Sequence, residues 1–199
     1  MDKIKSVKSI SIWIFIIPFL TINICLILIT QFQWVFPNQE DIIHNTIPYI
    51  DGGASISRTV RPYPSWLIFK PAMFLTSFLL IKYWIYNKEI IQYFDKNHKN
   101  LKKIIFFGVG SAVALTIHSI FLGIKFDNDL YKLFRRLIML TFIFFEVAAQ
   151  AYLVVTFYSL KDKLNKYIYP KILKIKLILV SMLIIVAILC IPLVMLPDN

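Results

Sequence analysis

Three polar side chains lie within apolar stretches of the sequence. Their types and spacing suit proton transfer or the binding of a polar substrate better than those of other residues in the chain. Glu146 falls near the middle of one stretch, Gln150 follows it by one helical turn on the same face, and His118 lies near the end of the preceding stretch. An ionisable side chain at the centre of a bilayer costs about 2.5–3.5 kcal/mol on insertion scales, so it marks a candidate functional site. A His118–Glu146 pair would be able to transfer a proton or hold a polar substrate.

The same residues also fit a structural role, which we expect in preference. The stretches that contain His118 and Glu146 are joined by a short connection and should pack as antiparallel helices, with the two side chains within one turn of each other in depth. An interhelical hydrogen-bond clasp, made by Glu146 in its protonated form, would then fix the packing. Lys70 enters the membrane from the same side and is a second candidate partner for Glu146.

A second group of polar residues lies in the longest connection, residues 37–65, and just after it. Hydroxyl and guanidinium groups close together can hold an anion such as a lipid phosphate, because arginine binds phosphate in a bidentate fashion. The candidates for lipid or anion binding are Asp51, Ser55, Ser57, Arg58, Arg61 and Lys70. The alternative is an ordered loop whose arginines form ion pairs with Glu40, Asp41 or Asp51.

The elements that position these residues are predicted to be membrane-spanning helices. The chain of 199 residues is 58% hydrophobic and 17% charged, with a mean hydropathy of +0.70, which argues against a water-soluble domain. Only helices satisfy the backbone in lipid over apolar runs of about 20 residues. We therefore predict an all-α, polytopic transmembrane bundle in a single domain, residues 1–199. Its five predicted spans are residues 10–36, 66–86, 104–124, 137–160 and 177–196.

The distribution of basic residues predicts the orientation. The N-terminal tail and the second and fourth connections together hold 14 Lys and Arg, whereas the other connections and the C-terminal tail hold six. Basic connections stay in the cytoplasm, so we expect the N-terminus there and the C-terminus outside or in a lumen. The net charge of +11 is assigned to this asymmetry rather than to nucleic-acid binding.

No motif predicts covalent chemistry. The two cysteines, Cys25 and Cys190, are far apart in apolar runs and indicate neither a disulfide framework nor a metal site. The sequence lacks HExxH, CxxC, Walker and Gly-x-Ser-x-Gly motifs, so we expect no catalytic residue, cofactor or metal.

One stretch resembles a known family. Residues 48–57 read Pro-Tyr-Ile-Asp-Gly-Gly-Ala-Ser-Ile-Ser, and Pro64 and an Ile68–Phe69 pair follow them. This pattern resembles the loop after the first helix in the DRAM/FRAG/SFK-type family, which includes autophagy modulators and GPI-remodelling proteins. The family usually has six spans, whereas this chain has five by our prediction. The resemblance implies an endomembrane or plasma-membrane protein tied to lipid handling.

Three functions are compatible with these observations. The first is lipid handling or membrane organisation, with membrane lipids as ligands and a membrane-protein partner or a second copy of the chain as a further candidate. The second is a small transporter or channel-like subunit with His118, Glu146 and Gln150 along a polar path. The third is a lipid-modifying enzyme that uses His44, His118 or Asp51 as acid or base.

Overall fold

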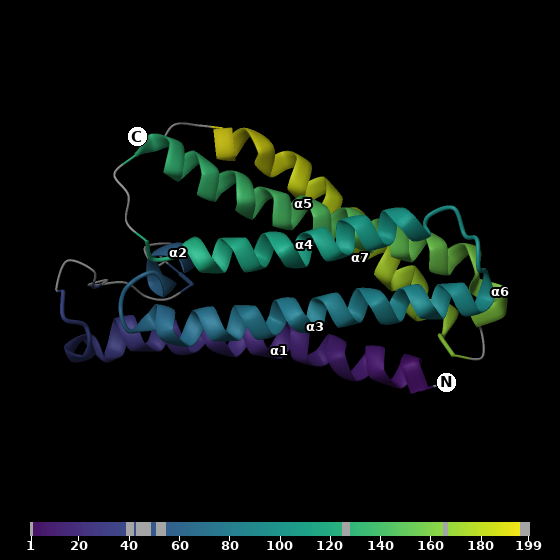
Figure 1. Ribbon diagram of the computed structural model, residues 1–199, viewed down its shortest axis with the longest axis horizontal. Helices are drawn as coiled ribbons and strands as arrows, with labels where there is room; N and C mark the ends of the chain where they lie inside the picture. The colour runs from purple at the N-terminus through teal and green to yellow at the C-terminus, as the bar shows by residue number, and fades with distance from the viewer. Residues whose placement is uncertain are drawn as a thin grey trace.

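The computed structural model describes residues 2–38, 42, 49–50, 55–124, 128–164 and 167–195. Its long helices are α1 (Asp2–Gln31), α3 (Ser65–Phe94), α4 (Leu101–Phe121), α5 (Asp129–Ser159) and α7 (Pro170–Met195) (Figure 1). The short elements are the 3₁₀ helix η1 (Gln33–Val35), α2 (Ile56–Val60) and α6 (Lys161–Leu164). The described part of the chain contains no strand.

Each long helix coincides with one predicted span. All five are long and apolar enough to cross a membrane, and the shortest, α4, has 21 residues. At 1.5 Å per residue, 21 residues extend about 30 Å, which is the thickness of a bilayer's hydrocarbon core. The prediction of an all-α bundle with five such helices is therefore confirmed, and the chain is compatible with a multi-pass integral membrane protein.

The helix boundaries differ from the predicted spans, mostly where charged residues flank an apolar run. Helix α5 begins eight residues before the predicted span at 137, and α7 begins seven residues before the one at 177. Hydropathy identifies only the apolar part of a helix. The backbone hydrogen bonds do not require apolar side chains, so the helix can continue into the charged residues that flank this part. In contrast, α1 ends at Gln31, five residues before the predicted end of the first span. The predicted loop 37–65 also contains the short helix α2.

The long helices pack in the order of the chain. The main contacts join α1 to α3, α3 to α4, α4 to α5, and α5 to α7, so the bundle is a row of antiparallel neighbours. Figure 1 shows η1 and α2 at one end of the row and α6 at the other. We call these the α2 end and the α6 end.

Two clusters of buried side chains hold the row together. The larger one joins α3, α4, α5 and the start of α7 around Trp84, which is fully buried, and the first half of α1 packs against it through Ile4, Val7, Ile10 and Ile14. The second cluster lies at the α2 end and joins α1, α2, α3 and α4 through Cys25, Val60, Phe69, Met73, Leu115 and Leu122. These contacts fix the relative depth of the helices that carry the polar residues.

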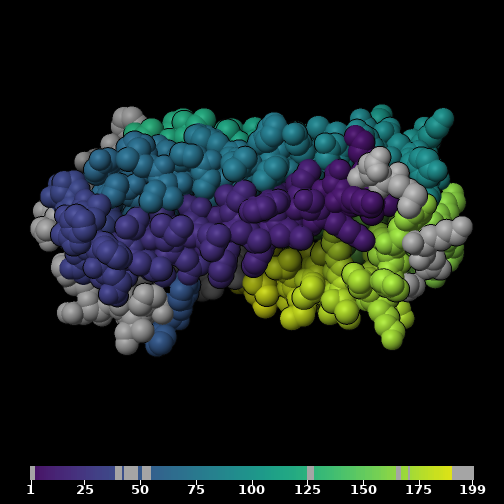
Figure 2. Space-filling view, turned by 90° about the horizontal axis from the view of Figure 1, so that it is seen from below, coloured from purple at the N-terminus to yellow at the C-terminus, as the bar shows by residue number. Residues whose placement is uncertain are grey.

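The outward faces of the bundle are apolar. Phe15 of α1, Phe106 of α4 and Leu189 of α7 are each about two-thirds exposed, at 68%, 65% and 67%. Figure 2 shows α1 lying along one face for its whole length, with α7 below it in that view over one half of the bundle only. Apolar surface on this scale is unfavourable in water and favourable in lipid, which agrees with five membrane-crossing helices.

Helices α3 and α4 approach each other closely at Gly108. A Cβ built on Gly108 would lie 2.3 Å from Cδ2 of the Trp84 ring, so only a glycine fits there. At the neighbouring Gly110, a Cβ would lie 2.6 Å from the ring of Phe145, which is only half-buried on α5. The two glycines thus differ in whether the opposing ring has room to move.

We expect Gly108→Ala to destabilise the protein. Overpacking against a buried indole costs about 1–3 kcal/mol. For a chain of this size, each kcal/mol lowers the unfolding midpoint by about 2–4 °C. Thermal unfolding of the detergent-purified protein measures this shift. Gly110→Ala is the matched control and should change the midpoint less, because Phe145 can turn outward; an equal or larger loss at Gly110 would contradict this account.

Candidate functional site

The predicted anion-binding residues of the first connection lie on and beside α2, and they bond mainly to one another. The backbone N–H of Arg58 donates to Ser55 Oγ at 3.3 Å, which caps the helix. Nη2 of Arg61 donates to Ser57 Oγ at 2.9 Å, one turn away. Arg58 itself is exposed. Asp51 and His44, the other candidates in this connection, lie outside the described residues.

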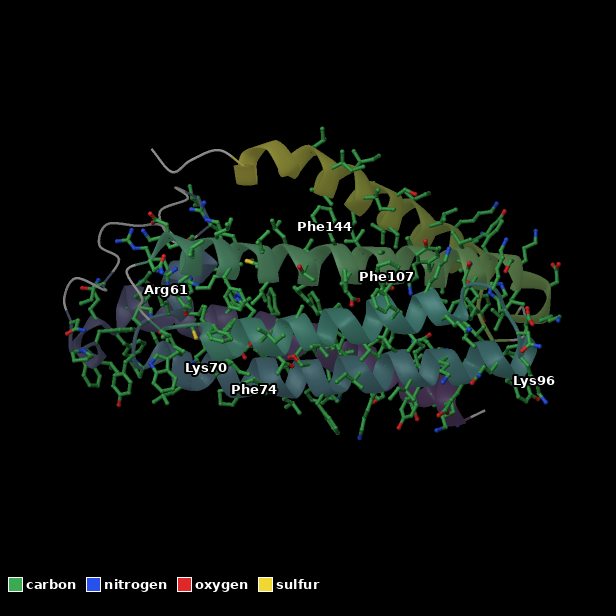
Figure 3. The ribbon with its side chains drawn as sticks, turned by 45° about the horizontal axis from the view of Figure 1, so that its top comes forward. Arg61, Lys70, Phe74, Lys96, Phe107 and Phe144 are labelled. Atoms are coloured by element: carbon green, nitrogen blue, oxygen red, sulfur yellow. The ribbon has the colours of Figure 1, made fainter. Side chains whose placement is uncertain are left out.

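Lys70 lies at the same end of the bundle and links two helices (Figure 3). Its Nζ donates to the carbonyl oxygen of Ile120 at 3.2 Å and lies 5.0 Å from the centre of the Trp66 ring. The last carbonyls of a helix carry partial negative charge, so Lys70 stabilises the C-terminus of α4. The structure therefore places Lys70 on the α4 terminus, and not beside Glu146.

An open groove runs between α4 and α5. Its volume is about 560 Å³. The residues that line it are Ile105, Phe106, Val109, Gly110, Val113, Ala114, Ile117, Ile138, Thr141 and Phe145. Thr141 provides the only hydroxyl among them, and that group already donates to the carbonyl of Leu137 at 2.8 Å. The groove surface therefore offers apolar contacts and little else.

Two basic side chains lie where this groove approaches the α2 end. His118 directly follows the lining residue Ile117 on α4, and Arg135 precedes the lining residue Ile138 by one turn on α5. Arg135 is close enough to act electrostatically on His118, and its guanidinium carbon lies 5.8 Å from the centre of the Tyr131 ring. Nδ1 of His118 and Nε of Arg135 are buried without a hydrogen-bond partner in the described chain. The Nε–H of Arg135 is therefore an unused donor, and Nδ1 of His118 is an unused donor or acceptor according to its tautomer.

Glu146 is the centre of a separate polar network in the α3–α4–α5 seam. Nε2 of Gln150 donates to Oε1 of Glu146 at 2.9 Å, and Oγ of Ser111 lies 2.7 Å from Oε2. The buried indole N–H of Trp84 faces the same carboxyl group without reaching hydrogen-bond geometry. Lys176 of α7 is near enough to act on it electrostatically.

The hydroxyl of Ser111 has one hydrogen and two acceptors within reach. Besides Glu146, it lies 2.8 Å from the carbonyl oxygen of Gly108. A hydroxyl donates a single hydrogen bond, so both contacts are hydrogen bonds at once only if Glu146 carries a proton and donates to Ser111. This arrangement fits the predicted clasp between α4 and α5. Neither the α4–α5 groove nor the pocket at the α6 end described below is lined by Glu146, so the network lies in a helix seam.

The structure does not bring His118 and Glu146 together. Glu146 lies at the depth of Ser111, and His118 is seven residues further along α4, which corresponds to about 10 Å. The prediction measured the depth of each residue from the end of its apolar run, and so placed His118 and Glu146 at similar depth. In fact α5 extends eight residues closer to the connection from α4 than its apolar run, which shifts the register.

Four residues in these sites are not among the candidates from the sequence. Arg135 and Lys176 fall in predicted connections between spans, and Trp84 and Ser111 fall inside the predicted spans 66–86 and 104–124. Each is helical in the structure, and Trp84 is fully buried. Arg135 precedes Ile138 by three residues, so the two lie on the same face if the helix continues back to Arg135. This spacing is the one sequence signal that places Arg135 on the side of the groove.

The described residues contain no group of three His, Cys, Asp or Glu side chains able to hold a metal ion. No family model, no curated protein and no solved structure matches this chain. The site is therefore interpreted from its own geometry.

Glu146→Gln should preserve folding and abundance. The amide retains an oxygen that accepts from Gln150 and gains an NH₂ that donates to Ser111, so it reproduces the protonated carboxyl. Glu146→Leu removes both bonds and should cost about 1–3 kcal/mol. Membrane abundance and thermal unfolding in detergent compare the two variants. Normal abundance of Glu146→Gln with loss of a proton flux that the wild type supports would overturn the clasp.

Proposed function

We propose that this protein is a multi-pass membrane protein of lipid handling, and that it binds an anionic phospholipid between α4 and α5. The headgroup lies at the α2 end, and an acyl chain lies in the groove. One observation carries the proposal, namely that Arg135 and His118 are found where an apolar groove approaches the end of the bundle.

The groove supports a lipid over a soluble ligand. Its walls offer no free hydrogen-bonding side chain, and it is open along the side of the bundle rather than closed. A polar molecule would lose its hydration there without compensation, whereas a hydrocarbon chain is stabilised by each methylene that it buries.

Charge supports a phosphate-bearing headgroup. Arg135 and the exposed Arg58 carry positive charge at the α2 end, and the described acid of that end, Asp129, already pairs with Lys132 at 3.1 Å. Guanidinium groups bind phosphate through two parallel hydrogen bonds. We also propose that the resemblance to the DRAM/FRAG/SFK-type family reflects a shared role in lipid handling, with Ser57 near the headgroup.

Filling the groove should remove the lipid. Val113 is a groove residue with 46% of its surface exposed, and Val155 on α5 is 53% exposed outside the groove. Val113→Trp is expected to lose most of the phosphatidylglycerol that co-purifies with the wild type, and the matched Val155→Trp to retain it. Lipid extraction and mass spectrometry measure the bound amount. If Val113→Trp keeps its lipid, the proposal is wrong; a loss of self-association in the same variant would show that the groove holds a second copy of the chain.

Removing the headgroup contacts should weaken binding in a graded way. Arg135→Gln is expected to lower affinity for phosphatidylglycerol about tenfold or more, because a hydrogen bond to a charged group contributes about 1.5–3 kcal/mol. Arg58→Ala should have a smaller effect. Lys96→Gln, which removes the same charge at the opposite end of the bundle (Figure 3), should have none. Equal losses in all three variants would indicate a non-specific effect of net charge and would contradict the proposal.

We propose that the α6 end faces the cytoplasm. The proposal is supported by 14 Lys and Arg in the segments of that end against six in those of the other. Single cysteines at Ser6 and Ser55, in a background without Cys25 and Cys190, test it with a membrane-impermeant maleimide on intact cells. We expect labelling at Ser55→Cys only; the reverse pattern would invert the topology.

A further inference from the structure

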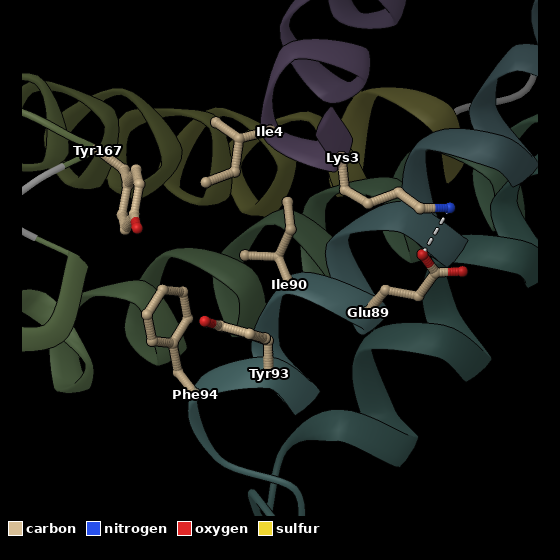
Figure 4. Close-up of a pocket in the computed structure, with 7 residues that line it drawn as sticks. All are labelled: Lys3, Ile4, Glu89, Ile90, Tyr93, Phe94 and Tyr167. Carbon is tan, nitrogen blue, oxygen red and sulfur yellow. Dashed lines mark ion pairs between the residues drawn. The ribbon is translucent and has the colours of Figure 1, made fainter. Parts of the chain in front are cut away.

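A pocket at the α6 end belongs to neither site described above. Its volume is about 180 Å³. Figure 4 shows its lining: Lys3 and Ile4 from α1, Glu89, Ile90, Tyr93 and Phe94 from α3, and Tyr167 from the connection between α6 and α7. Three of these seven side chains are aromatic and two carry opposite charges, so the pocket offers both ring faces and ionic groups to a ligand.

The aromatic rings form one side of the pocket. The rings of Phe94 and Tyr167 are inclined at 55° with centroids 6.1 Å apart, and Tyr93 meets Phe94 edge to face at 5.1 Å. Aromatic faces attract cations, and clusters of such rings bind quaternary ammonium groups in particular. This side of the pocket is therefore suited to an ammonium group that carries methyl groups.

The charged pair forms the other side, beyond Ile90 in Figure 4. Nζ of Lys3 lies 2.9 Å from Oε2 of Glu89, and the two side chains are 51% and 42% exposed. Ion pairs with this exposure contribute little to stability. Nζ also lies 4.5 Å from the centre of the Tyr86 ring, a contact that does not depend on Glu89. Lys3 can therefore exchange the carboxylate for a phosphate while it keeps its position.

The pocket lies at the depth expected for lipid headgroups. Glu89–Phe94 forms the last part of α3, directly beyond the predicted span that ends at residue 86. The α6 end is also the end at which the basic segments gather. A ligand in this pocket would be in contact with the interface of the membrane and not with its hydrocarbon core.

We propose that this pocket binds the zwitterionic phosphocholine headgroup of a membrane lipid. The trimethylammonium group packs against Phe94, Tyr167 and Tyr93, and the phosphate replaces Glu89 on Lys3. The site lies at the opposite end from the anionic-lipid site and selects a different headgroup, so it goes beyond the proposed function. A phosphoglycerol headgroup would leave the rings without a cation, and a primary ammonium would lose more hydration than a methylated one.

The headgroup preference is the first test. Binding of dihexanoyl phosphatidylcholine, phosphatidylethanolamine and phosphatidylglycerol is measured by calorimetry in maltoside detergent. The protein carries Val113→Trp, so that the α4–α5 groove does not contribute. We expect phosphatidylcholine to bind most tightly and phosphatidylglycerol most weakly. Equal affinity for phosphatidylglycerol and phosphatidylcholine would show a phosphate site only and overturn the proposal.

The aromatic side is tested with matched tyrosines. Tyr167→Leu should weaken phosphatidylcholine binding about two- to thirtyfold, the range of a cation–aromatic contact. Tyr167→Phe should retain binding, because it keeps the ring. Tyr169→Leu is the control, since Tyr169 is 77% exposed and does not line the pocket. Unchanged affinity in a folded Tyr167→Leu variant would contradict the proposal.

Substitutions of the two charged residues should change the affinity for phosphatidylcholine in opposite directions. Lys3→Gln should weaken phosphatidylcholine binding, whereas Glu89→Gln should strengthen it by freeing Lys3 for the phosphate. Weaker binding in Glu89→Gln would contradict the exchange. Arg135→Gln should leave phosphatidylcholine binding unchanged in all cases, so failure of this site and failure of the anionic-lipid site give different results.

Discussion

The indole of Trp84 lies directly on the backbone of α4 at Gly108, and the arrangement of the central helices depends on this contact. At this contact α3 lies close to α4, and Ser111, three residues further along α4, lies against Glu146 of α5. Glu146 then meets Ser111 and Gln150 within a seam that also contains the indole N–H. Polar groups in a membrane interior have no water to bond with, so they must find partners in neighbouring helices. The close packing at Gly108 makes those partners reachable.

The two ends of the bundle differ in chemistry because different residues terminate the helices there. At the α2 end, hydroxyls and basic groups bond among themselves or to helix carbonyls, and Arg135 and His118 retain buried nitrogens that have no partner among the described residues. At the α6 end, aromatic rings and a Lys–Glu pair surround a small pocket. If the bundle crosses a bilayer, its two ends lie at opposite surfaces, so the two groups of residues would meet different headgroups. The proposed lipid sites are based on this difference between the ends.

The sequence predicts the fold better than the sites, and particular residues show why. The five helices follow from hydropathy alone, since lipid requires continuous apolar helices of a known length. Glu146, Gln150 and Lys70 are conspicuous because charge or an amide is rare in an apolar run, and the one-turn spacing of Glu146 and Gln150 predicts their contact. Their neighbours on other helices are not predictable in this way. The partner of Lys70 is a backbone carbonyl of α4, and Glu146 has further neighbours on α3, α4 and α7. Such contacts depend on register and rotation, and a shift of one residue turns a helix by about 100°. The role of Arg135 was hidden because α5 continues past the apolar run.

The main contacts between the long helices join neighbours in the chain, α1 with α3, α3 with α4, α4 with α5, and α5 with α7. Contacts between segments close in sequence form quickly, because little loop entropy is lost when they meet. A ribosome delivers the helices in this same order. Every newly inserted segment therefore finds its binding surface already in the bilayer, and assembly can proceed by successive addition without waiting for the C-terminus.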